Sequence, residues 1–329
     1  MIHSPPDLIQ FDRDIILIHT SRDLIQFARD TKPERNTMTL NKRELRKEVD
    51  GYGAESVEQI CEALNECERM YSQTVAMRER INHRARAFIR TAMGYNPSDD
   101  DKKRQKLIAD EASRVFAMID AGEEVDGPLA RHVVPFVLEC LQSSEPFAIS
   151  ADAYKKRLEI LAEKLPVWNE HGATIKGFGL LGLARIVGIA GDFNKYDSVQ
   201  KLWKRFGLAV INGSCQGRVS SKKVQDMDDH EKIDRKAAWM ERGYSPKRRA
   251  VMFTIGDSLV KCSSGPFRKV YDWRKEYELK RPETKNAMHA HLKAQRYMEK
   301  QLLLELWEAW TGKEALVGFK DSKPFRVSA

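Results

Sequence analysis

The residues best suited to chemistry lie in three short segments in the second half of the chain. The first, 175–179, is a glycine turn with the sequence IKGFG. The second, 207–222, is a serine-bearing loop with the sequence GLAVINGSCQGRVSSK, and the third, 242–253, reads RGYSPKRRAVMF and opens a predicted helix on consecutive cations. Glycine turns and helix N-termini are groups that bind phosphate. The order of the three segments therefore points to a protein that handles a DNA backbone.

The glycine turn has two readings. Gly177 and Gly179 would let the backbone approach a phosphate closely, with Lys176 beside it. The helix predicted over 180–189 would then present its free N–H groups, which is the logic of a helix-hairpin-helix element that binds DNA. The alternative is an ordinary turn between two helices, since glycine serves there as well. The turn alone does not separate the two.

The helix that begins near residue 245 places cations where they cost stability. Ser245 is a good N-cap and Pro246 a good first residue. Lys247, Arg248 and Arg249 then fill the first turn, where the helix dipole disfavours each cation by roughly 0.3–1 kcal/mol. Such a turn predicts an anion to hold, and the alternative is a solvated basic surface. The predicted buried face is Val251, Ile255 and Leu259.

A further basic segment, 265–278, alternates cations with aromatic residues. Arg268 and Lys269 are the first of these cations. Such a pattern suits a groove that tracks a nucleic-acid backbone and stacks bases. The alternative, which we favour for most of the aromatics, is a helix with a buried face of Phe267, Val270, Trp273 and Tyr277.

The charge is unevenly distributed. The chain of 329 residues has a net charge of +8, and residues 201–329 hold 28 Lys and Arg against 16 Asp and Glu. This excess favours a polyanionic partner for the second half, against the alternative of a solvated Lys and Arg surface. Five scattered cysteines without a paired spacing predict a reducing cytoplasm and no structural metal. No apolar run is long enough to predict a membrane span.

The elements that position these residues are predicted to be helical. Residues 1–37 contain a tandem repeat and are expected to be disordered or translated from upstream, with Met38 as an alternative start to Met1. Residues 38–149 should form a helical region. A heptad over 57–88 predicts a coiled coil that forms a homodimer or higher homo-oligomer, unless it packs inside the chain. Helices are expected at 103–121, from about 128 to 141 and at 151–165, and at 197–206 with Asp197 as N-cap.

Over residues 175–310, the order of these motifs resembles the C-terminal transposase domain of the insertion-sequence one-ten family, the bridge-RNA-guided recombinases. The quoted residues are IKGFG, ARIVGIAGDFNKYDSVQKLWKRFGL, SCQGRVSSK, RGYSPKRRAVMF and GPFRKVYDWRKEYE. The predicted helices give an all-α fold class with a coiled-coil region before residue 150. The resemblance implies a helix-hairpin-helix transposase-type domain at 150–329. It also implies DNA and a guide RNA as partners.

By that resemblance the family's nucleophilic serine falls on Ser214, with Ser220 and Ser221 as fallback positions. A serine hydroxyl would attack a DNA phosphodiester and form a phosphoserine link. Arg218 and Lys222 flank the fallback serines and are expected to contact the nucleic acid. The family's RuvC-like domain, which holds the metal, is not found here. No intrinsic cofactor is therefore expected, and Mg²⁺ would come with a RuvC-like partner.

Two hypotheses follow from these residues. The first is a mobile-element or phage transposase that cuts and joins DNA through Ser214 with a RuvC-like partner. The second is a non-catalytic DNA- or RNA-binding protein derived from such a transposase. Retention of Ser214 and the cationic helix favours the first, and the missing acidic residues favour the second.

Overall fold

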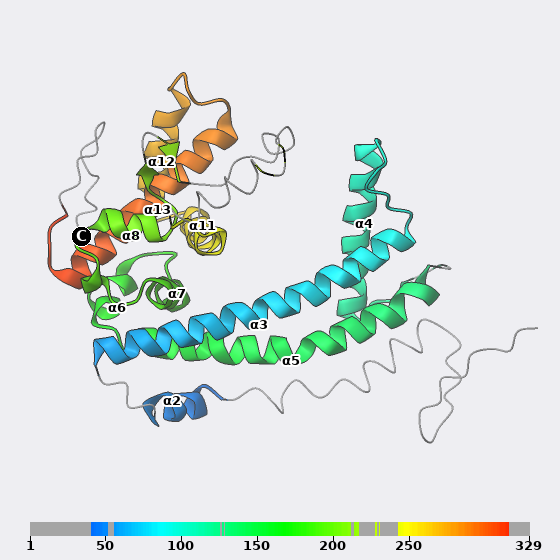
Figure 1. Ribbon diagram of the computed structural model, residues 1–329, viewed down its shortest axis with the longest axis horizontal. Helices are drawn as coiled ribbons and strands as arrows, with labels where there is room; N and C mark the ends of the chain where they lie inside the picture. Colours follow the sequence, from blue (N-terminus) through cyan, green and yellow to red (C-terminus); the bar gives the residue numbers. More distant parts are fainter. Residues whose placement is uncertain are drawn as a thin grey trace, which may run out of the picture. The chain divides into compact units, whose positions relative to one another are not determined.

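The fold is all-α in a computed structural model that describes residues 41–51, 56–125, 127, 129–211, 214–216, 228, 230 and 243–315 (Figure 1). The repeat in residues 1–37 and Met38 lie outside these ranges. The elements are α2 Lys42–Gly51, α3 Val57–Ala92, α4 Lys102–Ala121, α5 Ala130–Glu163, α6 Pro166–Glu170, the 3₁₀ turn η1 Gly172–Thr174, α7 Leu180–Ala190, the 3₁₀ turn η2 Phe193–Lys195, α8 Val199–Arg205, β1 Val210–Ile211, β2 Ser214–Cys215, α11 Pro246–Lys261, α12 Pro266–Leu279 and α13 Ala287–Thr311.

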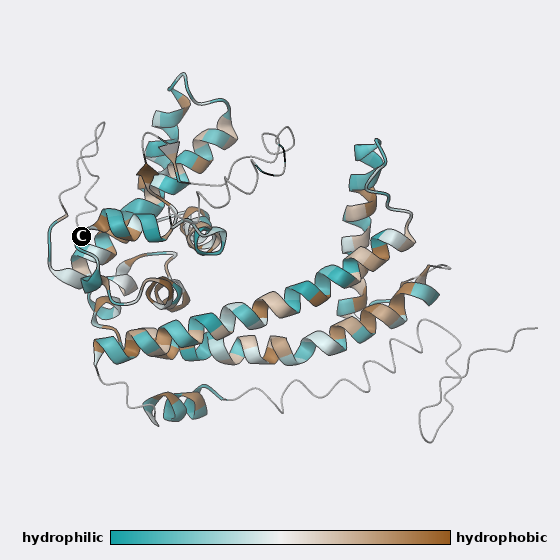
Figure 2. Ribbon diagram, viewed as in Figure 1, coloured by the Kyte–Doolittle hydropathy of each residue, from teal (hydrophilic) through white to brown (hydrophobic). Residues whose placement is uncertain are grey.

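The described residues divide into two compact units. Those of 72–152 form the first, and those of 41–71 and 153–315 form the second. The long helices α3 and α5 each contribute one end to each unit. Apolar and polar residues alternate around both helices, which gives each of them an apolar face to bury (Figure 2).

The first unit packs α4 against its segments of α3 and α5. The α4 helix begins at Asp101, which caps the Arg104 amide, and it ends at Gly122 in the left-handed conformation. The rings of Phe88 and Phe136 pack in a tilted arrangement, with centroids 4.4 Å apart and planes at 40°. The buried residues of this small core come from all three helices and, at Val125, from the segment between α4 and α5: Ala85, Ile89, Ala112, Val115, Phe116, Ile119, Val125, Ala130, Val133, Val134, Val137 and Cys140.

In the second unit, α2 is fastened to the end of α5 by ion pairs. Arg46 lies 2.7 Å from Glu163, and Arg157 lies 3.0 Å from Glu48. The apolar side of α2 is completed by Leu45, which is fully buried. Ion pairs on its polar side and the burial of Leu45 on its apolar side thus hold α2 in place.

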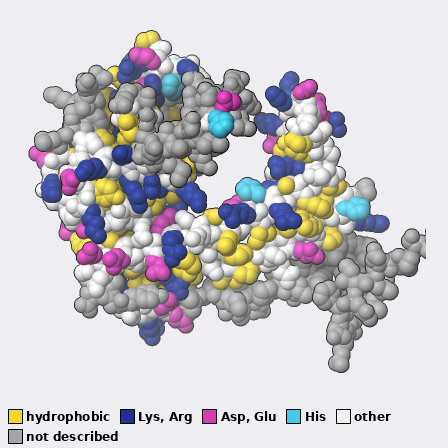
Figure 3. All heavy atoms as spheres, viewed as in Figure 1, with side chains coloured by type: hydrophobic (Ala, Val, Ile, Leu, Met, Phe, Trp, Pro, Cys, Tyr) yellow, Lys and Arg dark blue, Asp and Glu magenta, His cyan; other side chains and the backbone are white. Residues whose placement is uncertain are grey.

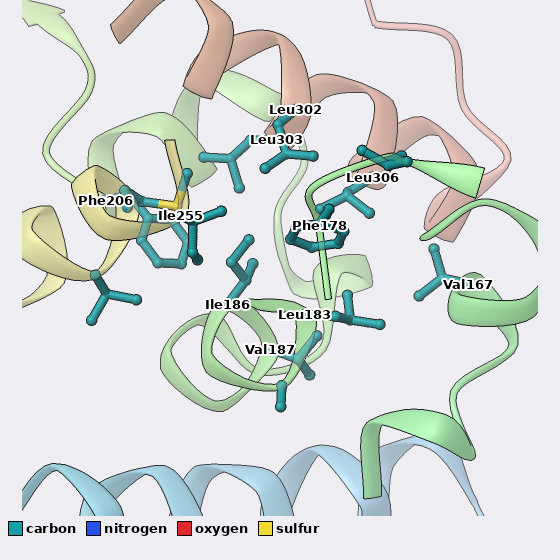
Figure 4. Close-up of a cluster of buried hydrophobic side chains, with 14 of the residues drawn as sticks. Val167, Phe178, Leu183, Ile186, Val187, Phe206, Ile255, Leu302, Leu303 and Leu306 are labelled. Atoms are coloured by element: carbon teal, nitrogen blue, oxygen red, sulfur yellow. The ribbon is translucent and has the colours of Figure 1, made fainter. Parts of the chain in front are cut away.

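The core of the second unit gathers side chains from α6, α7, α11 and α13 and from the turns between the helices. Figure 4 shows Phe178, Ile186 and Ile255 directed into one cluster with the leucines of α13. Phe178 belongs to the glycine turn and is 5% exposed. Its ring fixes that turn on the core, and α7 follows immediately.

Several sequence-based predictions are confirmed. Ser245 caps α11 by accepting a hydrogen bond from the Arg248 amide, with Pro246 as first residue, and Val251, Ile255 and Leu259 are buried. Gly207 follows α8 with φ of 72°, and the apolar stripe of α8 is buried. That stripe is Val199, Leu202, Trp203 and Phe206.

The prediction of separate helices ending near 141 and beginning at 151 was wrong. The structure has one helix, α5, which runs through Pro135 and Pro146. A proline inside a helix removes one backbone hydrogen bond and clashes with the preceding turn. Buried positions nevertheless continue on both sides of Pro146, at Cys140 and Ala151. Tertiary burial therefore outweighs the local helix-breaking preference.

Two smaller differences concern caps and strands. The N-cap of α8 is Ser198, not Asp197, whose carboxylate pairs instead with Lys201 one turn along. The segment predicted as a serine-bearing loop contains a two-stranded antiparallel hairpin, with Val210 opposite Cys215 and Ile211 opposite Ser214. The two strands are separated by Asn212 and Gly213, and Asn-Gly is a strong sequence signal for a two-residue hairpin turn.

The predicted heptad seam of α3 is covered within the chain at both ends. Ile60 and Leu64 are buried in the core of the second unit, and Ala85 is buried in the core of the first. Arg78, between them, is exposed. Packing within the chain therefore buries Ile60, Leu64 and Ala85 without a second copy. The homodimer stays a prediction.

Candidate nucleic-acid interface

The candidate site is built around the β1–β2 hairpin, which we call the serine hairpin (residues 210–215). Gln216, which is 6% exposed, fastens its base. The Gln216 amide donates to the Ala209 carbonyl at 2.8 Å, and its side-chain oxygen accepts from the Ala209 amide at 3.3 Å. The structure describes the backbone of Ser214 but not its side chain.

Arg296 of α13 lies beneath the serine hairpin. Its Nη2 donates to the carbonyl oxygens of Gly207 at 2.9 Å, Ala209 at 3.4 Å and Gln216 at 2.8 Å. Burial lowers the pKa of the Arg296 guanidinium, and the nearby Cys215 acts in the opposite direction. The hairpin therefore rests on a half-buried cation that its own carbonyl oxygens hold in place.

One turn further along α13, Glu299 forms a buried ion pair with Arg249. Arg249 Nη1 lies 2.8 Å from Glu299 Oε2, and the Glu299 side chain is 0% exposed. Gln295 donates to the second Glu299 oxygen at 3.2 Å. Burial raises the pKa of Glu299 to about 7, against the opposing effect of Arg249.

Lys300, the next residue of α13, faces the same cluster. Its Nζ lies 5.1 Å from the centre of the Trp203 ring. Burial, followed by repulsion from Arg296, lowers the pKa of Lys300 to about 8, although Cys215 opposes this shift.

The start of α11 does not present all three of its predicted phosphate-binding cations. Lys247 is exposed. Arg248 is half-buried and donates to the Gly243 carbonyl at 2.8 Å. Arg249 is directed inward to Glu299, with 17% of its side chain exposed. Of the three, Lys247 is the one best placed to meet an external phosphate.

Arg248 has a cationic neighbour that the sequence reading did not place beside it. Arg205, from the end of α8, lowers the pKa of Arg248 further after burial has done so. Arg205 is itself held by two hydrogen bonds to the Ile189 carbonyl, at 3.2 and 2.9 Å. Two guanidinium groups therefore share this end of α11 and repel each other, which a bound anion would relieve.

The glycine turn packs at the opposite end of α11. A side chain at Gly177, where φ is 84°, would come within 2.8 Å of the Cys262 Cβ and 3.3 Å of the Ser258 carbonyl. At Gly177 the backbone therefore approaches the end of α11 closely, where the sequence had suggested an approach to a phosphate. Gly179 has open space around it and caps α7 from an extended conformation.

Lys176, in the glycine turn, lies beside the start of α12. Its side chain lies against Gly265, the N-cap of α12. Lys269, in the first turns of that helix, is exposed, as is Lys176. Arg268 pairs with Asp272 at 2.8 Å and also donates to the Val260 carbonyl at 2.7 Å. The turn and α12 therefore form one basic surface, which we call the turn patch: Lys176, Arg268 and Lys269.

The aromatic residues of α12 are mostly structural, as favoured above. Phe267 and Val270 are buried. Trp273 and Tyr277 stack on each other with ring centroids 6.2 Å apart. They are half-buried.

Arg218 and Lys222, together with the fallback serines Ser220 and Ser221, lie outside the described residues. On the face seen in Figure 3, several Lys and Arg side chains (dark blue) lie in the region of α8, and acidic side chains (magenta) lie between them. The basic character of this unit is therefore local rather than continuous.

The sequence reading missed the polar cluster of α13, which is Gln295, Arg296, Glu299 and Lys300. A signal was present, because polar residues at 295 and 299 recur one turn apart among apolar positions. A second signal was Gly256 inside α11. A side chain at Gly256 would come within 2.6 Å of Glu299 Oε1. Such a glycine indicates a close approach between helices.

The part of the chain that the structure describes contains no group of three or more His, Cys, Asp or Glu residues that could hold a metal ion. No described helix is long and apolar enough to cross a membrane. Searches of known protein families, of curated proteins and of solved structures found no match to this chain.

Proposed function

We propose that this chain is a DNA-binding, transposase-like protein that acts in transposition or recombination, with Ser214 as the candidate nucleophile. The observation that carries the proposal is the seating of the serine hairpin over Arg296. Lys300 lies on the same face of α13, one turn on. Cations beneath the hairpin backbone favour the approach of a phosphodiester to this segment of the chain.

The surfaces at the two ends of α11 support DNA binding. Lys247, with Arg205 and Arg248, lies at its first turn, and the turn patch packs on its last turn. The 16 residues of α11 span roughly 24 Å at 1.5 Å per residue. A DNA backbone that follows α11 would meet both surfaces, and it would pass the serine hairpin near the first turn.

The chemistry requires a group that activates the serine. A serine hydroxyl at neutral pH is a weak nucleophile without a base or a metal. We therefore propose that a RuvC-like partner supplies Mg²⁺ through its own acidic residues, and that a guide RNA and a second copy of the chain complete the assembly. In this scheme the chain contributes DNA contact and the attacking hydroxyl. The Ser214 oxygen bonds to the phosphorus, the bond from phosphorus to one deoxyribose oxygen breaks, and the serine proton is transferred, through a basic group of the partner, to that leaving oxygen.

Formation of a covalent protein–DNA adduct tests the proposal. The chain is incubated with the partner, Mg²⁺ and end-labelled DNA, and adducts that resist denaturing electrophoresis are counted for the wild type, Ser214→Ala and a Ser220→Ala, Ser221→Ala double variant. We expect the adduct to disappear only with Ser214→Ala. An adduct that survives this substitution and is lost in the double variant would move the nucleophile to residue 220 or 221.

A second candidate function is non-catalytic binding of DNA or RNA. It is favoured by the exposed lysines Lys176, Lys247 and Lys269, because contact with phosphate requires only these charges and no activated serine. If no partner yields an adduct while the chain still binds nucleic acid with strong salt dependence, this second function is the correct one.

A further inference from the structure

Arg296 joins the two sides of the serine hairpin. Two of its carbonyl partners, Gly207 and Ala209, precede β1, and the third, Gln216, follows β2. A hairpin with two residues in each strand is too small to be stable alone. Its order must therefore come from groups at its base, and Arg296 reaches both sides of that base.

The same face of α13 connects the hairpin to α11. Glu299 follows Arg296 by three residues, and neighbours at this spacing lie on one side of a helix. Glu299 holds Arg249 at 2.8 Å, and Arg249 lies two residues after the exposed Lys247. One turn of α13 thus fixes both the serine hairpin and the first turn of the cationic helix.

A buried arginine is costly to keep when it has no fully compensating partner. Half-buried Arg296 carries part of that cost: burial lowers the pKa of its guanidinium, Arg249 acts in the same direction, and Cys215 and Glu299 oppose them. An apolar residue would fill the same space without this penalty. An arginine is suited to the position because its long side chain carries Nη2, held in a planar group, to a point within reach of three carbonyl oxygens.

We propose that Arg296 is a positioning residue that sets the serine hairpin in a fixed relation to the start of α11. DNA held by Lys247 is thereby presented to Ser214 in one geometry. The inference rests on the proposed role of Ser214 for its catalytic consequence. The ordering of the hairpin itself depends only on the hydrogen bonds to Arg296.

Arg296→Lys is the informative variant. It keeps the positive charge beneath the hairpin, so attraction of DNA is preserved. A lysine side chain is one bond shorter, and its ammonium sits on a flexible stem, so its Nζ does not reach the position of Nη2 between the three carbonyl oxygens. Arg185→Lys is the matched control, since Arg185 is also partly buried but pairs with Glu68 of α3 at 3.2 Å instead of with the hairpin.

The experiment combines amide hydrogen exchange, DNA affinity and adduct rate, measured on the full chain. For Arg296→Lys we expect exchange of peptides covering 207–216 to become about ten-fold faster, with peptides of α7 unchanged. Affinity for a DNA duplex should stay within about two-fold, while the adduct rate falls about 100-fold, because a small misplacement is enough to slow attack. Arg185→Lys should leave the exchange of 207–216 unchanged.

The outcomes separate the inference from the proposed function. Unchanged exchange of 207–216 in Arg296→Lys overturns the inference, as does an adduct rate that falls only in proportion to DNA affinity. The adduct rate is measured with the RuvC-like partner and Mg²⁺ present, and if the wild-type chain forms no adduct under these conditions, the proposed function fails. The exchange comparison with Arg185→Lys then still decides whether Arg296 orders the hairpin.

Discussion

Arg249 Nη1 lies 2.8 Å from Glu299 Oε2, and this pair joins α11 to α13 inside the second unit. From the sequence, Arg249 is indistinguishable from its neighbours Lys247 and Arg248 as a phosphate ligand. The structure assigns these residues three different environments: an exposed lysine, a half-buried arginine on a backbone carbonyl, and a buried ion pair. Position around the helix, rather than residue type, decides which charge is free to meet a partner.

The raised pKa of Glu299 predicts a pH-dependent stability. Its pKa in the folded state is about 7, against an ordinary value of 4.5. Between pH 4.5 and pH 7, the Glu299 carboxyl group keeps a proton in the folded state that it releases in the unfolded state. The free energy of unfolding should therefore fall as pH rises from about 4.5 to 7, by on the order of 3 kcal/mol from this group. Urea unfolding at pH 5 and pH 8 measures the change.

Glu299→Gln isolates this contribution, because glutamine cannot ionise. The other titrating groups cancel when the two proteins are compared at each pH. We expect the wild type to lose stability relative to the variant as pH rises from 5 to 8. Two parallel pH profiles would mean that Glu299 stays charged throughout, held by Arg249.

The close contact of α11 with α13 predicts a steric effect at Gly256. An added Cβ would lie 2.6 Å from Glu299 Oε1 and 2.9 Å from Gln295 Nε2. Both atoms belong to the buried cluster and have little room to move. Gly256→Ala should therefore destabilise the chain by roughly 1–3 kcal/mol, although alanine is the better helix former.

Gly51→Ala is the control for that substitution, because nothing lies within 4 Å of a Cβ at Gly51, the last residue of α2. It should be neutral or slightly stabilising. Equal effects of both variants in urea unfolding would rule out a tight contact at Gly256.

The sequence predicted the local features of this fold well and the long-range ones poorly. The caps and apolar stripes of α8 and α11 were largely correct, because each depends on residues within two turns of one helix. The unbroken α5 was missed, since the burial that stabilises it around Pro146 comes from other helices. Tertiary contact decides such cases, and a single sequence does not display it.

The same distinction applies to the candidate site. The glycine turn, the serine segment and the cationic helix can be read directly from the sequence. The polar spacing on α13 is visible in the sequence, but the partners of Arg296 and Glu299 are not, because they lie about 80 and 50 residues earlier in the chain, at 207–216 and at Arg249. Their partners are backbone carbonyls and a buried arginine, which leave no motif.

Pro146 predicts a stabilising substitution in the middle of α5. Proline there lacks the amide that would bond to the carbonyl four residues earlier. Pro146→Ala restores this bond and should raise the free energy of unfolding by roughly 1–3 kcal/mol. Pro166→Ala is the control, since Pro166 is at the first position of α6, where no intrahelical amide bond is missing. A kink at Pro146 that the fold requires would instead make Pro146→Ala destabilising.

The last prediction separates DNA contact from stability at the start of α11. Lys247→Ala should weaken DNA binding for all sequences alike, and it should reduce the slope of affinity against salt by about one phosphate contact. Its effect on unfolding should be small, because the side chain is exposed. Fluorescence anisotropy with a labelled duplex at several salt concentrations measures both the affinity and the slope.

Arg249→Ala should behave in the opposite way. It leaves Glu299 buried without its cation, which costs about 3–5 kcal/mol of stability. DNA affinity of the fraction that remains folded should change little, because the guanidinium is not presented to solvent. Lys280→Ala serves as a control for charge alone, since Lys280 is exposed and pairs with Glu276 at 2.7 Å. If Arg249→Ala weakened binding as much as Lys247→Ala without loss of stability, Arg249 would have to leave Glu299 when DNA binds.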